Sequence, residues 1–349
     1  MGRSATGRAE VDNRGRRHQR TGWLAILSTI LALIGVAAAP AEAESGLSSG
    51  PALSVSVERL QESLVCPKDI SSVARNVVLL VPGTTLDPRT NFGFSWMREF
   101  DAMGYPYCYV ITPDHGMGDV QVTSEYVVYA IRQIHERSGR KVDVVGHSQG
   151  GMNPRWALRW WPELRSMVDD YVGLAPDAHG GANVDLMCAK GSCPPSIWQQ
   201  RYESNLVRAM NSGGETFPGI SYTAAWTDYD QFLNPPGKPV GGEPTMIKGA
   251  TNIRIQDICP GDTADHVAIG VYDPVAFAVI VDALTHPGPA DPERIDRSVC
   301  TQALPPHVDP VMFPVNYAKV WGEIWVNLTS YPPVNAEPPL KEYARVADR

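Results

Sequence analysis

The chain has 349 residues, of which 43% are hydrophobic and 19% charged, and its formal net charge is −8 at pH 7. A chain of this length and apolar content can bury one large α/β core. Its acidic balance argues against nucleic acid and anionic membrane surfaces as partners, because both carry dense negative charge.

The first 43 residues have the order of an export signal. Six arginines occur among residues 1–20, residues 23–39 are almost wholly apolar, and Ala41-Glu42-Ala43 offers an A-x-A cleavage site. We expect cleavage after Ala43, which leaves 306 residues (44–349) with 24 Lys and Arg against 35 Asp and Glu, a net charge of −11. The alternative is an uncleaved membrane anchor, because a span needs roughly 17 to 20 apolar residues.

The remainder of the chain alternates apolar runs with stretches of helical periodicity. We predict strands at residues 76–81, 107–111, 142–145, 171–174, 220–225 and 253–258. Between them, residues 123–137, 153–168 and 197–210 carry apolar side chains at spacings of three and four, which is typical of amphipathic helices. This repetition predicts a single α/β domain over residues 44–349, with a mostly parallel central sheet and helices on both faces.

A further helix is predicted over residues 309–328. The apolar side chains at helical spacing are Val311, Val315, Ala318, Trp321, Ile324 and Trp325. We interpret this side of the helix as one that packs against the core.

Residues 146–150 read Gly-His-Ser-Gln-Gly and match the pattern G-x-S-x-G. The pattern alone is weak: residues 46–50 match it too, but Ser48 precedes no helix and is interpreted as a linker residue. Ser148 ends a predicted strand and opens a predicted helix, where a strained turn lifts the hydroxyl clear of the sheet and glycines provide the clearance. We therefore predict that Ser148 is a nucleophile.

Such a serine needs a histidine base and an acid that orients the histidine. In hydrolases with this motif the chain order is serine, acid, histidine. His286 ends a helical stretch and His307 follows two prolines, whereas His266 lies after the last predicted strand and before a helical stretch. We predict His266 as the base.

Two aspartates compete for the role of the acid. Asp228 and Asp230 both follow the predicted strand at residues 220–225. We favour Asp230, because the apolar pair Phe232 and Leu233 and the proline that follows them predict a turn that fixes its carboxylate. Asp228 is interpreted as a solvated or capping residue.

The carbonyl oxygen of a substrate gains charge in the transition state and needs hydrogen-bond donors. The residue after the nucleophile, Gln149, supplies one backbone N–H. Thr84, in the loop after the first strand, is predicted to supply the second through its backbone N–H, with help from its hydroxyl. The alternative for residues 82–85 is a plain Pro-Gly turn.

All six cysteines lie after the export signal, and an even number suits three disulfides in an oxidising compartment. They are Cys66, Cys108, Cys188, Cys193, Cys259 and Cys300. Their spacing contains no pattern typical of zinc, so we expect no metal.

Several segments in chain order resemble the family of secreted α/β-hydrolase lipases related to Candida antarctica lipase B. They are VLLVPGTT (78–85), MGYPYC (103–108), TSEYVVYAI (123–131), SQGG (148–151), LAPD (174–177), PSIWQQ (195–200), ADH (264–266) and EPPLKEYARV (337–346). The resemblance covers nearly all of residues 44–349. It implies an α/β-hydrolase fold, hydrolysis of carboxylic esters and no cofactor.

The same resemblance carries roles to individual positions. It implies the triad Ser148, Asp230 and His266, the oxyanion hole Thr84 and Gln149, and the pocket-wall residues Asp177 and Gln200. It also implies the disulfides Cys66–Cys108 and Cys259–Cys300. Cys188 and Cys193 have no counterpart and are close enough in sequence to pair with each other.

Two departures limit what the resemblance implies. His147 stands where the family has a tryptophan at the floor of the alcohol pocket, so pocket size and enantiopreference are not carried over. The C-terminal disulfide of the family is missing, and the helix at residues 309–328 is more aromatic and charged. Because that region forms part of the acyl-pocket wall in the family, the preferred acyl length is also left open.

We therefore expect a secreted, monomeric serine hydrolase that cleaves carboxylic esters, such as acylglycerols, through an acyl-enzyme. Its partners are a lipid or small ester substrate and, transiently, lipid interfaces. Two alternatives stay open: an acyltransferase that passes the acyl group to an alcohol of an envelope lipid, and an inactive hydrolase fold used for surface binding. The latter requires a broken triad, and every expected triad position is filled.

Overall fold

The computed structural model describes residues 49–202, 204–233 and 243–348. The predicted export signal and Ser48 lie outside these residues. No helix in the described part is both long and apolar enough to cross a bilayer.

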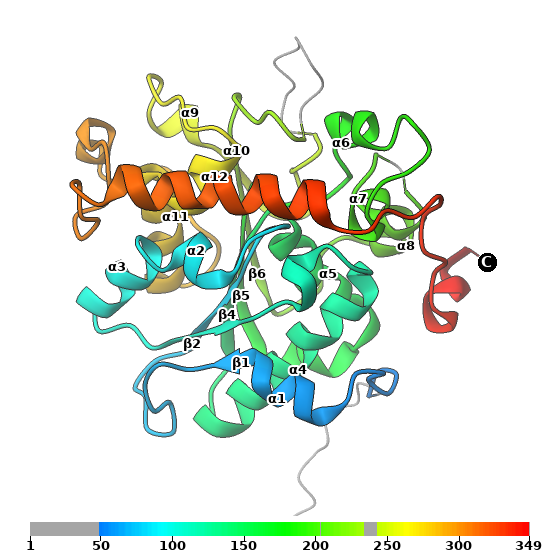
Figure 1. Ribbon diagram of the computed structural model, residues 1–349. Coiled ribbons are helices and arrows are strands. Elements are labelled where there is room, and N and C mark those ends of the chain that lie inside the picture. The colour runs from blue at the N-terminus through cyan, green and yellow to red at the C-terminus, as the bar shows by residue number, and fades with distance from the viewer. Residues whose placement is uncertain (1–48, 203, 234–242, 349) are drawn as a thin grey trace, which may run out of the picture. The chain divides into compact units, whose positions relative to one another are not determined.

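A seven-stranded sheet forms the centre of the domain, with the strand order β1-β3-β2-β4-β5-β6-β7 (Figure 1). The strands are β1 (Leu64–Val65), β2 (Val77–Val81), β3 (Tyr107–Val110), β4 (Val142–His147), β5 (Val168–Leu174), β6 (Ser221–Trp226) and β7 (Thr251–Arg254). β1 pairs with β3 in antiparallel orientation, and the other described neighbours are parallel. Every residue of β2, β3 and β4 is buried, which explains the unbroken apolar runs of β2 and β3.

Helices cover both faces of the sheet, as predicted. On one face, α1 (Val57–Ser63), α4 (Val120–Ser138), α5 (Gln149–Trp160) and α8 (Asn205–Asn211) share a core with Val77, Leu79 and Val81. On the other, α3 (Trp96–Ala102), α10 (His266–Val271) and α11 (Pro274–Thr285) share a core with Val78 and Leu80. The alternation along β2 thus divides one apolar strand between two cores.

Three of the predicted segments form other elements than predicted, whereas the remaining predicted segments differ from the observed elements by a few residues at their ends. Residues 253–258 hold the end of strand β7 and then α9 (Ile255–Ile258), since a helical turn buries both of its isoleucines on one side. The helix predicted at residues 153–168 ends at Trp160, because Pro162 stops it before the 3-10 turn Pro162–Ser166 and strand β5. The helix predicted at residues 197–210 is two helices, α7 (Pro195–Gln199) and α8.

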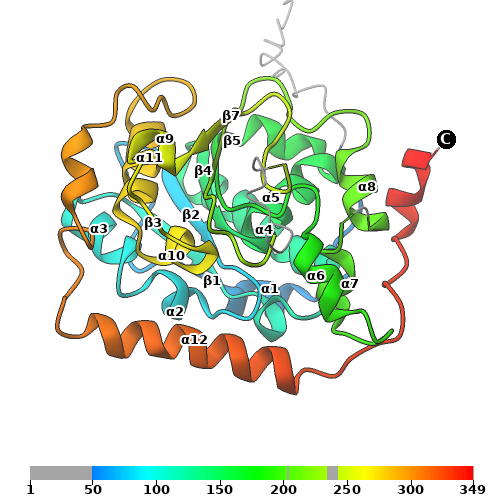
Figure 2. The same ribbon diagram turned by 90° about the horizontal axis from the view of Figure 1, so that it is seen from above.

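The C-terminal helix α12 (Phe313–Ser330) does not pack against the core as predicted. It lies along the outside of the domain beside α2 (Pro88–Phe92), as the two views show (Figures 1 and 2). Only Val320 and Ile324 are buried, whereas Trp325 is 71% exposed. The stripe that contacts the protein therefore runs through Tyr317, Val320, Ile324 and Leu328, a spacing of three and four that is offset from the predicted side.

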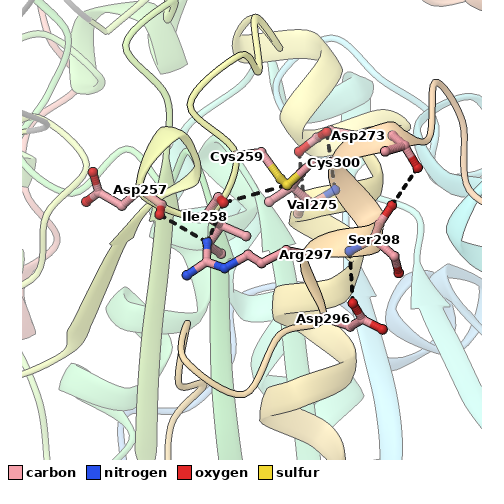
Figure 3. Close-up of a disulfide and its surroundings, with 11 residues drawn as sticks. Asp257, Ile258, Cys259, Asp273, Val275, Asp296, Arg297, Ser298 and Cys300 are labelled. Carbon is pink, nitrogen blue, oxygen red and sulfur yellow. Dashed lines mark hydrogen bonds between the residues drawn. A yellow bond between two sulfur atoms is a disulfide. The ribbon is translucent and has the colours of Figure 1, made fainter.

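The structure forms three disulfides, Cys66–Cys108, Cys188–Cys193 and Cys259–Cys300. Figure 3 shows Cys259–Cys300, which joins the segment after α9 to the 3-10 turn Arg297–Thr301. Arg297 donates hydrogen bonds to the carbonyl oxygens of Asp257 and Ile258 beside the disulfide. The bond closes a loop with a sequence separation of 41, for which loop-closure entropy predicts a stabilisation of about 4 kcal/mol.

Candidate active site

Ser148 occupies the turn between β4 and α5 in a backbone conformation that side chains rarely adopt, with φ 55° and ψ −123°. The flanking glycines make that turn possible. A Cβ on Gly146 would lie 2.0 Å from the Gly150 carbonyl oxygen, and a Cβ on Gly150 would lie 2.1 Å from the Val81 carbonyl oxygen. Val81 ends the strand that precedes Thr84, so Gly150, which has no side chain, lets the turn that carries Ser148 approach the predicted oxyanion loop.

The remaining site residues follow the carboxyl ends of neighbouring strands. Thr84 follows β2, Asp177 follows β5, Asp230 follows β6, and His266 opens α10 after β7 and α9. Parallel strands place all these ends at one edge of the sheet, where α/β proteins build their sites. The fold thus gathers residues that are up to 182 positions apart in the chain.

Asp230 and His266 form a buried pair. The Asp230 Oδ2 lies 2.7 Å from His266 Nδ1, and the side chains are 2% and 6% exposed. The other oxygen, Oδ1, accepts the backbone N–H groups of Phe232 at 2.9 Å and Leu233 at 2.8 Å. The turn after Asp230 therefore fixes its carboxylate, and the bond to Nδ1 leaves His266 Nε2 for the predicted nucleophile.

The alternative candidates for the acid and the base take part in other interactions. Asp228 forms an ion pair with Arg254. His286 lies 3.2 Å from Asp282, and His307 lies 2.8 Å from Glu99. None of the three lines the cavity that contains Ser148.

The electrostatics of His266 suit a general base. Burial lowers its pKa, but the charge and the hydrogen bond of Asp230 outweigh burial, so the pKa lies above the ordinary value of 6.5. A base must be deprotonated to accept the serine proton, so, if His266 is the predicted base, we expect activity to be lost as the pH falls through that raised pKa. In Asp177, by contrast, the effect of burial prevails: it raises the pKa of the carboxyl to about 8 and keeps this group protonated at neutral pH.

The two predicted oxyanion donors come from different elements. Gln149 is the first residue of α5, so its backbone N–H has no partner within the helix. The Thr84 hydroxyl donates to Gln200 Oε1 at 2.9 Å and accepts from Gln149 Nε2 at 3.2 Å. The proton of this hydroxyl is therefore directed at Gln200, and the Thr84 backbone N–H is the donor left for an oxyanion.

Helix α12 holds the loop that carries Thr84. Asn327 Nδ2 donates to the Thr85 carbonyl oxygen at 2.8 Å, and Glu323 accepts the Asp87 N–H at 2.6 Å. Glu323 also pairs with His115 at 3.1 Å, and the His115 carbonyl oxygen accepts the Thr85 N–H at 2.7 Å. Thr85 has a φ of 76°, and these bonds fix it in that conformation.

A narrow, mostly apolar cavity opens onto Ser148 and His266. The centres of water-sized molecules can occupy about 60 Å³ of it. Its polar side includes Thr84, His147 and Gln200. Asp177, predicted as a pocket-wall residue, does not line the cavity, because its side chain is fully buried; its backbone N–H donates to the Ser148 carbonyl oxygen at 3.3 Å. The nine apolar lining side chains are Leu86, Val184, Met187, Ile197, Phe232, Leu233, Val267, Ile324 and Leu328. They come from α6 (Ala182–Met187), α7, α10, α12 and the loops after β2 and β6.

Comparison with known proteins agrees with this geometry. The chain is 30% identical to Lipase B of Pseudozyma antarctica over 248 residues, which cover 70% of this chain and 71% of that protein. The chain belongs to the lipase B family. As a member of it, the protein is a carboxylic ester hydrolase with a single-domain α/β-hydrolase fold. No family model matches the sequence.

Solved structures place this member of the lipase B family among lipases. Aspergillus fumigatus lipase B is 30% identical and superposes with a TM-score of 0.77, covering 85% of this chain and 74% of that one. The propeptide form of the Bacillus licheniformis lipase BlEst2 has a TM-score of 0.51 at 18% identity, covering 65% of this chain and 54% of that one. The second likeness concerns the fold alone.

Some residues around the site carry no sequence signal that predicts a role. Asn91, Glu323 and Asn327 contact the oxyanion loop or its supports, but each comes from a helix distant in sequence from Ser148. Their contribution depends on which helix packs beside the loop. A search for motifs near the nucleophile therefore misses them.

Proposed function

We propose that this member of the lipase B family is a secreted, monomeric hydrolase of aliphatic esters, including acylglycerols, that works through an acyl-enzyme on Ser148. The observation that carries the proposal is the cavity in which Ser148 and His266 meet nine apolar side chains. An apolar pocket with a few convergent polar groups suits an acyl chain attached to a reactive carbonyl.

The chemistry follows from the positions of the side chains. Ser148 Oγ attacks the ester carbonyl and gives its proton to His266, which Asp230 orients and stabilises as an imidazolium. The N–H groups of Thr84 and Gln149 bind the oxyanion. His266 then protonates the leaving alcohol, and water, activated by the same histidine, releases the acid from the acyl-enzyme.

The three disulfides support the proposed export of the protein. Disulfides persist in oxidising compartments and are rare in reducing ones. All three lie within residues 44–349, the part that remains after cleavage near Ala43.

The test is hydrolysis of p-nitrophenyl esters from acetyl to palmitoyl by the oxidised protein, below and above substrate solubility. Because the free space beside Ser148 is narrow, we expect short acyl chains to be hydrolysed faster than palmitate. Adding an alcohol separates hydrolysis from acyl transfer, since a transferase forms a new ester in place of the free acid. Absence of acyl release from every ester would contradict the proposal.

Contact with lipid interfaces is the second part of the proposal. Leu328 of α12 packs against the cluster that includes Val184 of α6, and both residues line the cavity. On the same two helices, Trp325, Val326 and Leu186 are 71%, 57% and 63% exposed. Exposed apolar side chains on two helices that line the cavity favour a neutral or zwitterionic lipid surface, because the acidic chain is repelled by an anionic one.

We expect Val326→Ser to lower the rate on emulsified tributyrin by about two- to fivefold and to leave the rate on soluble p-nitrophenyl acetate unchanged, because it removes apolar area from the lipid-facing side alone. Val57→Ser is the matched control: Val57 is 51% exposed but lies on α1. Equal effects of the two substitutions on the emulsion rate would exclude this surface as the docking face.

A further inference from the structure

His147 is a buried histidine that the reaction described above does not use. It ends β4 directly before Ser148, and only 2% of it is exposed. Burial lowers the pKa of its imidazole to about 3, so the ring is neutral at neutral pH. A neutral imidazole has one N–H to donate.

The ring lies between the two elements that must meet at the substrate. Its Nε2 lies 2.9 Å from the carbonyl oxygen of His266, and its Nδ1 lies 3.2 Å from Asn91 Oδ1. Both partners are acceptors. The single N–H is therefore on Nε2, where the contact is shorter, and it donates to the backbone of the catalytic histidine.

Asn91 joins the oxyanion loop to α10 directly, beside the His147 ring. Its Oδ1 accepts the Gly83 N–H at 2.9 Å, and its Nδ2 donates to the Gly270 carbonyl oxygen at 3.0 Å. Gly83 immediately precedes Thr84, and Gly270 belongs to α10, the helix that His266 opens. Polar bonds beneath the site thus join the oxyanion loop to the base.

Close packing holds the ring in this place. A Cβ on Gly270 would lie 1.9 Å from His147 Cδ2, and a Cβ on Gly83 would lie 3.0 Å from His147 Nδ1. The rings of His147 and His266 lie 5.2 Å apart, so a shift of one ring is transmitted to the other. Both the oxyanion loop and α10 therefore pack closely against this imidazole.

We propose that His147 is a positioning residue that fixes the backbone of His266 relative to the oxyanion loop, through its Nε2–H and its packing between Gly83 and Gly270. The proposal rests on the function proposed above. It assigns a purpose to a buried histidine that the proposed acyl-enzyme chemistry does not use.

The test compares His147→Met, which fills a similar volume without a donor, with His147→Gln, whose amide N–H can reach the same carbonyl. We expect the methionine variant to lose about 10- to 100-fold in kcat with KM for p-nitrophenyl butyrate nearly unchanged, because a small displacement of a catalytic group has this effect. The glutamine variant should recover to within about threefold of the wild type, because it restores the bond to His266.

A spectroscopic measurement separates positioning from general stability. The low-field proton resonance between Asp230 Oδ2 and His266 Nδ1 should move or broaden in the methionine variant and return in the glutamine variant. Val172→Ala, a buried substitution on β5, is the control for stability loss and should leave kcat and the resonance unchanged. If His147→Met fails to fold, Gly270→Ala, which displaces the ring directly, should give the same kcat loss.

The outcomes distinguish the two proposals. An inactive wild type would overturn the proposed function. An active wild type whose kcat is unaffected by His147→Met, or a glutamine variant as slow as the methionine variant, would overturn the positioning role. A rise in KM at constant kcat would also overturn it, because the ring would then serve as a pocket wall alone.

Discussion

Replacing Ser148 with alanine is expected to lower kcat on a soluble ester by about 10⁶-fold, because the triad acts as a unit and loses its only attacking oxygen. The residual rate should come from the oxyanion donors and substrate binding, which the substitution leaves in place. The measurement is steady-state release of p-nitrophenol by the purified, oxidised protein.

Stability serves as the control for this variant. Ser148 holds a φ of 55°, and alanine at the same position keeps that conformation and the Gly146 and Gly150 contacts. The thermal midpoint of Ser148→Ala should therefore stay near that of the wild type. Substantial ester hydrolysis by a folded Ser148→Ala variant would show that the nucleophile lies elsewhere.

The second large effect is expected from Asp230→Asn, which should lower kcat by about 10⁴-fold. An amide at this position can present its NH₂ to His266 Nδ1 and favours the wrong tautomer of the imidazole. Asp230 also raises the pKa of His266 against the effect of burial. Without that charge the pKa falls, so the acid limb of the residual kcat/KM profile should move to lower pH.

Asp228→Asn is the matched control, two residues away on the same loop. Asp228 pairs with Arg254, which is partly exposed, and such pairs contribute about 0 to 1 kcal/mol. We expect its kcat and pH profile to match those of the wild type. A larger loss of kcat in Asp228→Asn than in Asp230→Asn would reverse the assignment of the acid.

Much of this arrangement could be predicted from local sequence. The strand, the glycines and the helix around Ser148 are contiguous, so the nucleophile turn is readable without tertiary information. The turn after Asp230 is equally local, because the backbone donors belong to Phe232 and Leu233. Disulfide pairing between Cys188 and Cys193 also follows from closeness in sequence.

The predictions that were wrong concern apolar patterns that fit two different structures. Residues 253–258 hold buried isoleucines that fit either a strand or a short helix, and in the structure the end of β7 is followed by the helical turn α9. In α12 the helical spacing was right, but several apolar residues could form the buried side. Contact with α2 and α10 selected Val320 and Ile324 and left Trp325 exposed.

The sequence by itself therefore determined the α/β class, the nucleophile turn and the order of the candidate triad, because each depends on residues close together in the chain or on the alternation of elements. Only the tertiary structure decided which groups hold the site together. His147 contacts the His266 backbone across 119 positions, and Asn327 reaches the Thr85 carbonyl across 242. Such contacts depend on which elements the packing of the two cores brings side by side, and no local pattern of residues encodes that choice.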